Sequence, residues 1–149
     1  MVRFIFLFLV LTSLIIYADN EIVSHANKKN IIKNSLNDGF YVLAEKKCRD
    51  ILTKIPNSEK KDYHFFLIQS LYAQGKYDEV LAIVSDLKKD DQLIYWKSKT
   101  LMSLGRNDEA LNILKGDQSK GLLSSERMHL KSVLLYDLGD YNKSNEILI

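Results

Sequence analysis

Apolar residues recur with helical spacing along most of the chain, and a glycine interrupts the pattern at intervals. After Gly75 the apolar positions fall at i, i+3, i+7 and i+10, on one face of a helix: Tyr77, Val80, Val84 and Leu87. A matching stripe precedes the glycine: Leu67, Ile68 and Leu71. Glycine costs about 1 kcal/mol relative to alanine inside a helix, and it tolerates the left-handed conformation that ends one. The pattern therefore predicts two helices joined by a tight turn at Gly75.

The same pattern occurs four times. The turn glycines are Gly39, Gly75, Gly105 and Gly139, at intervals of 36, 30 and 34 residues. Equivalent positions hold similar residues: Ser35, Leu71, Leu101 and Leu135 four before the glycine; Ala44, Val80, Ala110 and Ser144 five after; Cys48, Val84, Leu114 and Leu148 nine after. One hairpin cannot bury its apolar face alone, whereas stacked hairpins can. The sequence predicts an all-α fold of four helical hairpins, at about residues 22–57, 60–89, 91–117 and 124–149.

The N-terminal segment has a different character. It carries one positive charge at Arg3, an apolar run over residues 4–17, and Ala18 before a polar stretch. This is the order of regions in a secretory signal peptide. At 1.5 Å per residue the run spans roughly 21 Å, short of the ~30 Å hydrocarbon core, which favours a cleaved leader over a retained anchor. We predict a signal peptide at residues 1–18 and an exported domain at 19–149, periplasmic or secreted, that meets a membrane only through the leader.

Charge and cysteine content narrow the function classes. The formal net charge is +2, with 21 basic and 19 acidic residues, and removing the leader with Arg3 leaves 21 − 1 − 19 = +1. A nearly neutral chain lacks the basic face expected of nucleic-acid binding. The single cysteine, Cys48, cannot form an intramolecular disulfide, and it occupies the same position as Val84 and Leu114. We expect it to pack as a small core residue.

The repeated residues resemble those of the tetratricopeptide repeat (TPR) family. The matching residues are the leucine–x–x–x–glycine steps Leu71–Gly75, Leu101–Gly105 and Leu135–Gly139, the G-x-Y steps at Tyr41, Tyr77 and Tyr141, the small residues Ala44 and Ala110, and Pro56 seventeen residues after Gly39. The resemblance covers roughly residues 22–149. Two copies depart from it, because Ile32 and Ile68 stand where the family has a small residue. The resemblance implies a right-handed α-solenoid whose first helices line a concave, peptide-binding surface.

By that resemblance, the groove is lined by residues ten, six and three before each glycine. The candidate groove residues are Lys29, Lys33, Phe65, Gln69, Tyr72, Tyr95, Lys99, Met102, His129 and Tyr136. Such a surface suits an apolar or aromatic segment that carries some acid. The same aromatic stripe is equally compatible with packing against the next hairpin. The carboxylate clamp of chaperone-binding TPR domains is not matched: Lys29 fits its first position, but Lys33, Phe66, Gln92 and Trp96 stand at the others.

No catalytic or metal-binding pattern is visible in the sequence. The three histidines, His25, His64 and His129, lack metal-ligand spacing, and no glycine-rich phosphate loop occurs. A nucleophilic role for Cys48 would need a base and an activating environment, which the sequence does not propose. We therefore expect no catalytic residue, no metal and no cofactor.

The sequence thus predicts a non-catalytic scaffold that binds a protein or peptide partner, of the kind that serves complex assembly in the bacterial cell envelope. The alternative is a regulatory or substrate-handling subunit of a secreted enzyme system. The apolar residues Ile147, Leu148 and Ile149 would form an uncovered terminal face. They predict docking on a partner, self-association through the C-terminal helix, or a longer reading frame.

Overall fold

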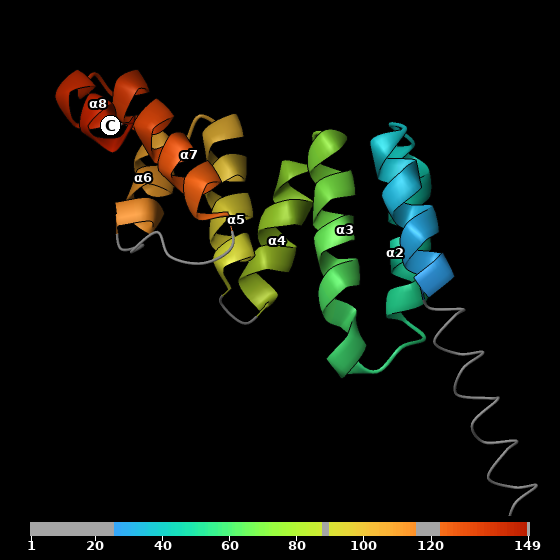
Figure 1. The fold of residues 1–149 in the computed structure, drawn as a ribbon. Coiled ribbons are helices and arrows are strands. Elements are labelled where there is room, and N and C mark those ends of the chain that lie inside the picture. The colour runs from blue at the N-terminus through green and yellow to red at the C-terminus, as the bar shows by residue number, and fades with distance from the viewer. Residues whose placement is uncertain (1–25, 88–89, 116–122, 149) are drawn as a thin grey trace, which may run out of the picture. The chain divides into compact units, whose positions relative to one another are not determined.

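A computed structural model describes residues 26–87, 90–115 and 123–148 of the 149-residue chain. The predicted signal peptide lies outside these ranges. The described residues form helices and short turns without a strand, which confirms the all-α prediction (Figure 1). By its contacts the chain divides into two compact units, Met1–Leu67 and Ile68–Ile149, and each unit is described by itself.

The helices follow one another with short connections. They are residues 26–37, α2 (Tyr41–Leu52), the 3₁₀ helix η1 (Asn57–Glu59), α3 (Lys60–Ala73), α4 (Tyr77–Asp86), α5 (Asp91–Ser103), α6 (Asn107–Lys115), α7 (Ser124–Asp137) and α8 (Tyr141–Leu148). The boundary between the two units falls within α3. Within the described ranges, no helix combines the length and the apolar character that a membrane span needs.

Each predicted turn glycine adopts the left-handed conformation. The φ angles of Gly39, Gly75, Gly105 and Gly139 are 80°, 74°, 73° and 83°. At Gly75, the glycine N–H donates to the Tyr72 carbonyl and the Lys76 N–H donates to the Leu71 carbonyl, both at 3.0 Å. These two bonds form a Schellman motif, which satisfies carbonyls left free at a helix end. The same pair of bonds recurs at the other three glycines, so the turn prediction is confirmed in all four copies.

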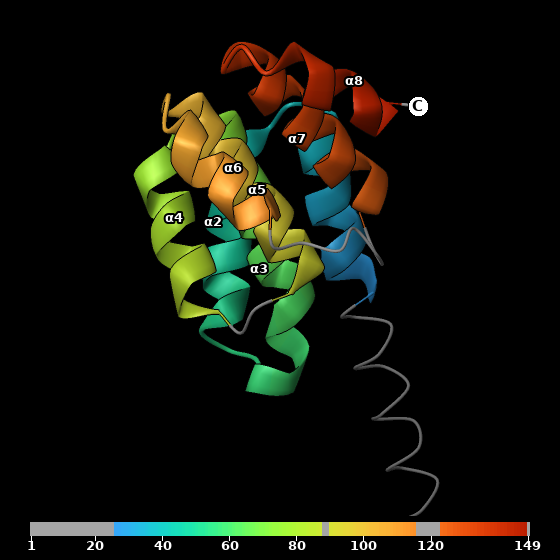
Figure 2. The ribbon, with the colours of Figure 1, turned by 90° about the vertical axis from the view of Figure 1, so that its left-hand side faces the viewer.

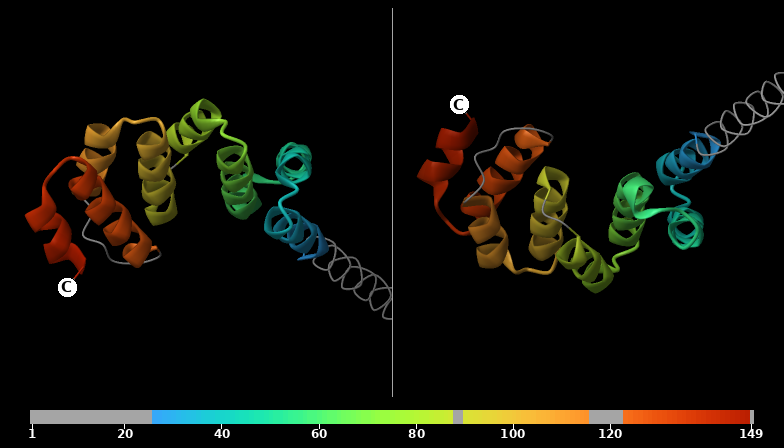
Figure 3. Two further views of the ribbon diagram at one scale, coloured as in Figure 1. Left: turned by 90° about the horizontal axis from the view of Figure 1, so that it is seen from above. Right: turned by 90° about the horizontal axis from the view of Figure 1, so that it is seen from below.

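In unit 2, helices pack as antiparallel pairs. The helix α5 packs against α6, α7 packs against α8, and α5 also contacts α7 (Figures 2 and 3). A continuous core joins α5, α6 and α7: Leu101, Ala110, Leu111, Leu114, Leu130, Leu134 and Leu135. Burying a leucine side chain stabilises the fold by about 1.5–3 kcal/mol, so this core outweighs any surface contact in the unit.

Burial follows the repeat. The residues seven before, four before and five after the glycine are buried in every copy: Ile32, Ile68, Ser98 and Ser132; Ser35, Leu71, Leu101 and Leu135; Ala44, Val80, Ala110 and Ser144. Cys48 is also fully buried, which confirms its predicted place in the core. The internal period read from the sequence therefore corresponds to a period in packing.

The fourth hairpin has serines at two of these core positions. Ser132 on α7 and Ser144 on α8 lie with their hydroxyl oxygens 3.0 Å apart, and each hydroxyl also reaches the main-chain carbonyl of the other residue. Buried polar groups cost little when they are hydrogen-bonded. The pair thus replaces an apolar contact between the two helices.

Candidate functional site

One lysine and three aromatic residues gather in unit 2. We call Tyr72, Tyr95, Trp96 and Lys99 the Lys99 cluster. The ammonium nitrogen of Lys99 lies 5.0, 5.3 and 5.2 Å from the ring centroids of Tyr72, Tyr95 and Trp96. It also donates a hydrogen bond of 3.1 Å to the Tyr95 hydroxyl. A cation within about 6 Å of a ring face is attracted by the ring, and here one ammonium is attracted by three.

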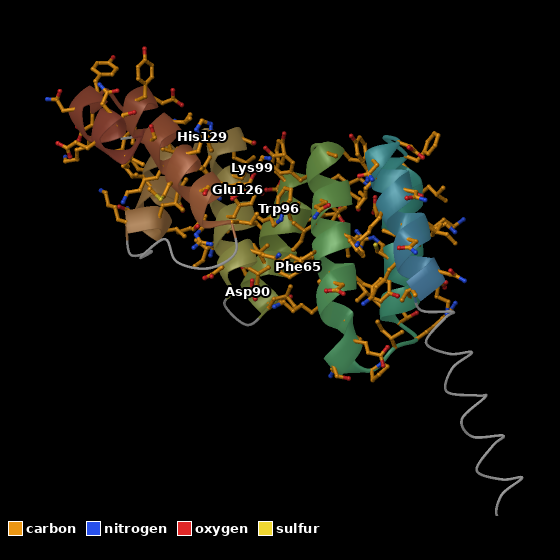
Figure 4. The ribbon with its side chains drawn as sticks, in the orientation of Figure 1. Phe65, Asp90, Trp96, Lys99, Glu126 and His129 are labelled. Atoms are coloured by element: carbon orange, nitrogen blue, oxygen red, sulfur yellow. The ribbon has the colours of Figure 1, made fainter. Side chains whose placement is uncertain are left out.

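Local helix geometry places three of the four members of the cluster. Tyr95 and Lys99 are four residues apart on α5, and positions i and i+4 share one face of a helix. Asp90 fixes the start of that helix, because its side chain accepts a hydrogen bond of 2.8 Å from the Gln92 N–H. Trp96 and Lys99 are three residues apart on the same helix (Figure 4). The helix therefore presents Tyr95, Trp96 and Lys99 together before any tertiary contact forms.

Tyr72, near the end of α3, completes the cluster through tertiary packing. The centroids of its ring and the Trp96 ring lie 5.4 Å apart, with 63° between the ring planes. Its hydroxyl oxygen lies 2.7 Å from the Ser103 hydroxyl oxygen. The Tyr95 and Trp96 ring centroids also lie 5.4 Å apart, with 75° between the ring planes. Edge-to-face ring pairs contribute about 0.5–1.5 kcal/mol each beyond their buried area. All four members of the cluster are partly buried, so they are fixed in place and still reachable from outside.

The neighbouring helix α7 adds polar groups. Glu126 and His129 are exposed on α7, which packs against α5 (Figure 4). Met102, by contrast, turns inward and packs against the leucine core of unit 2. Gln69 is partly buried on α3, and Tyr136 is 61% exposed at the far end of α7. Of the predicted groove residues in unit 2, the structure thus brings Tyr72, Tyr95 and Lys99 into direct contact.

The remaining predicted groove residues belong to unit 1. Lys29 forms an ion pair of 2.7 Å with Asp62, and this hydrogen bond raises the pKa of the lysine above its ordinary value. Lys33 is exposed, and Phe65 is only 8% exposed, with the Lys61 ammonium 5.9 Å from its ring centroid. A side chain as covered as Phe65 offers little surface to a partner. The candidate site is therefore confined to unit 2.

Trp96 is the member of the cluster that the groove spacing missed. It stands nine residues before Gly105, outside the ten, six and three positions of the resemblance, at one of the carboxylate-clamp positions that this chain does not match. The signal that could have found it is its position beside Tyr95 and three residues before Lys99. Trp96 is also the one tryptophan of the chain, which makes its fluorescence specific to this site.

Unit 2 also contains a hollow away from the Lys99 cluster. It is a cleft of about 620 Å³ among α4, α5 and α6, whose lining includes Leu81, Lys97, Arg106, Glu109 and Ile113. The Arg106 guanidinium binds both carboxylate oxygens of Glu109 at 2.7 Å, so its charge is already matched. Lys97 and Lys99 are two residues apart, about 200° around the helix, and hence point to opposite sides of α5.

Groups with catalytic potential are either buried or isolated. Burial raises the pKa of the Cys48 thiol to about 12, so at neutral pH this side chain is not a thiolate nucleophile. Burial also lowers the pKa of His64 below its ordinary value. In the described parts of the chain, no group of three His, Cys, Asp or Glu side chains could hold a metal ion.

A scan of the sequence against protein-family models finds no match, and a search among curated proteins finds none either.

Proposed function

We propose that this protein is an exported, non-catalytic scaffold of TPR-like hairpins, and that the Lys99 cluster captures an extended segment of a partner protein. The segment places an apolar or aromatic side chain against the rings and a carboxylate at the Lys99 ammonium. The observation that carries this proposal is the ammonium held above three ring faces at 5.0–5.3 Å.

The cluster suits binding because it is ordered in advance. Fixing a free lysine side chain costs about 1.5–2 kcal/mol of rotamer entropy, and binding sites that are already ordered avoid this cost when the partner arrives. An ammonium has three N–H donors, of which one reaches Tyr95 within the described residues. The others are available to a carboxylate. The tyrosine and tryptophan rings offer large contact area with few rotatable bonds.

The TPR-like assignment rests on the repeated turn and the repeated burial. Four Schellman turns and three buried positions per hairpin support stacking of hairpins as right-handed solenoids do, with the first helices facing the partner. Export to the bacterial periplasm or beyond rests on the leader-like residues 1–18 alone. A role in assembling cell-envelope complexes follows from the fold type and the compartment together, by analogy.

The fluorescence of Trp96 gives a direct test. A phage library of random 12-residue peptides is selected on the protein, and the enriched peptides are synthesised and titrated while Trp96 emission is followed. Each titration is repeated with Lys99→Met and with Lys97→Met. The second variant is the matched control, because it removes the same charge from the opposite side of α5.

The proposal predicts that enriched peptides combine an aromatic residue with Asp or Glu and change the Trp96 emission saturably. Lys99→Met should weaken their binding about tenfold, which corresponds to about 1.4 kcal/mol and matches a hydrogen bond to a charged group. Lys97→Met should leave the affinity unchanged. The proposal fails if no peptide is enriched over a blank surface, or if the two lysine variants bind equally well.

A further inference from the structure

A pair of tyrosines stands exposed on the fourth hairpin. Tyr136 at the end of α7 is 61% exposed and Tyr141 at the start of α8 is 56% exposed. Their ring centroids lie 5.0 Å apart, with 68° between the ring planes. Leu138, which lies between them in the sequence, is 41% exposed. We call these three residues the Tyr136 face. Large apolar side chains that are grouped and exposed indicate an interaction surface.

The second hairpin contains an equivalent pair, and there it is covered. Tyr72 and Tyr77 flank Gly75 as Tyr136 and Tyr141 flank Gly139. The ring centroids of Tyr72 and Tyr77 lie 5.3 Å apart, with an angle of 54° between the ring planes. The cover is the first helix of the next hairpin, α5. That helix lays the Trp96 ring and the Lys99 ammonium on the Tyr72 ring and brings the Ser103 hydroxyl to the Tyr72 hydroxyl. The pair at Gly75 therefore shows which groups cover such a pair: an aromatic ring, an ammonium and a hydroxyl from a neighbouring helix.

The helical segment 26–37 carries related groups at the same positions. Counted back from Gly39, Lys33 and Asn37 stand where Lys99 and Ser103 stand relative to Gly105. Both side chains are exposed. The segment could therefore place an ammonium on a tyrosine ring and a polar side chain at its hydroxyl, as α5 does.

Charge favours the same pairing. Residues 26–37 contain three lysines and no acid, and one of these lysines, Lys29, is already paired with Asp62 at 2.7 Å. Residues 137–148, around the Tyr136 face, contain three acids and one lysine, and that lysine, Lys143, is already paired with Asp140 at 2.6 Å. Opposite net charge on two surfaces speeds their encounter and sets which surfaces meet.

We propose that the protein self-associates head to tail, with segment 26–37 of one copy covering the Tyr136 face of the next. Lys33 lies over the Tyr136 ring and Asn37 bonds its hydroxyl. The two surfaces differ, so the contact is heterologous and every assembly keeps one free surface of each kind at its two ends. Association therefore continues beyond a dimer as concentration rises, and salt weakens it.

The test uses two variants that each lose one surface. Tyr136→Ala removes the face and keeps the segment, whereas Lys33→Glu reverses the charge on the segment and keeps the face. Matched controls are Met128→Ala, at another exposed apolar site on α7, and Lys28→Glu, at another exposed lysine of the segment. All variants are purified by the same route, so that they share one N-terminus, and sedimentation velocity is measured from 1 to 100 µM.

The wild-type chain and both controls should grow in mean mass with concentration, past the dimer. Tyr136→Ala and Lys33→Glu should each remain monomeric, with association weakened at least tenfold. An equal mixture of those two variants should form a 1:1 dimer and nothing larger, because it contains one intact copy of each surface. A wild-type chain that stays monomeric at 100 µM overturns the proposal. So does Tyr136→Ala that still associates, or Lys33→Glu that still associates, which is the result that pairing of one Tyr136 face with another would give. A mixture that stays monomeric overturns the proposal as well.

Discussion

Replacing Gly75 by alanine or valine measures how much the repeated turn contributes to stability. A Cβ atom built at Gly75 meets no heavy atom within 4 Å, so a substitution there encounters no steric obstacle from neighbouring groups. The cost comes from the backbone alone, because φ is +74°. Non-glycine residues cost about 1–2 kcal/mol in this left-handed region.

The expected effect combines two terms. Alanine loses about 1–2 kcal/mol in the folded state, and it regains about 0.4–1 kcal/mol because it restricts the unfolded chain. The net loss for Gly75→Ala is therefore about 1 kcal/mol. Valine is β-branched, and positive φ is a rare conformation for such residues, so Gly75→Val should lose about 2–3 kcal/mol. For a chain of this size, 1 kcal/mol corresponds to a shift of roughly 3–4 °C in Tm.

Urea unfolding followed by circular dichroism gives the measurement, with Tm as a second readout. Gly75→Asn is the matched control, since asparagine adopts the left-handed conformation more readily and should lose less than alanine. Gly105→Ala should lose about as much as Gly75→Ala, because its φ of 73° and its open surroundings are the same. If Gly75→Val left stability unchanged, the turn would not depend on glycine and the reasoning would be refuted. A loss above 4 kcal/mol for alanine would contradict the absence of a steric clash.

Three further outcomes can be checked by urea unfolding. Ser98 and Ser132 occupy the same repeat position, but the Ser98 hydroxyl has no hydrogen-bond partner among the described residues, whereas Ser132 bonds Ser144. We therefore expect Ser98→Ala to leave the free energy of unfolding unchanged or to raise it. Ser132→Ala should lower the free energy of unfolding by about 1 kcal/mol. The Tyr63 hydroxyl is likewise buried without a partner in the described chain, so Tyr63→Phe should keep or raise stability by up to about 1 kcal/mol. Burial raises the pKa of Cys48 from 9.0 to about 12, so the stability that the protonated thiol supplies is complete below pH 9 and is lost as pH rises toward 12. Relative to a Cys48→Ala variant, the wild-type chain should therefore lose about 1 kcal/mol more between pH 9 and 10, and parallel curves would contradict the burial argument.

The architecture of each hairpin was predictable because its determinants are local. Each hairpin is specified by residues close together in the sequence: a glycine that ends one helix, one linking residue, and an apolar stripe at i, i+3 and i+7. The structure has a left-handed glycine at each predicted turn. The serine pair in the fourth hairpin was not predictable in the same way. Both are small residues at repeat positions, but their hydrogen bond joins two helices and no spacing within either helix indicates it.

The candidate site was predictable only in part, for the same physical reason. Tyr95 and Lys99 share a helix face, so their association could be read from spacing. The contact of Tyr72 with Trp96 joins two helices through their side chains, and spacing within one hairpin carries no information about it. The pairing of Lys29 with Asp62 is equally non-local, and it occupies a lysine that the resemblance had placed in the groove.

The two proposed surfaces contain tyrosine pairs at equivalent repeat positions, one partly buried and the other exposed, and this difference makes the surfaces separable. Around Gly75 the pair is partly buried, and its neighbours Trp96 and Lys99 form the site that we propose for a peptide. Around Gly139 the pair is exposed, and we propose that a second copy supplies the missing lysine. Sites without shared contacts affect stability and binding additively, so Lys99→Met should weaken peptide binding and leave self-association intact, while Tyr136→Ala should do the reverse. If either variant changed both properties, a peptide and a second copy would be competing for one surface, and the two proposals would reduce to one.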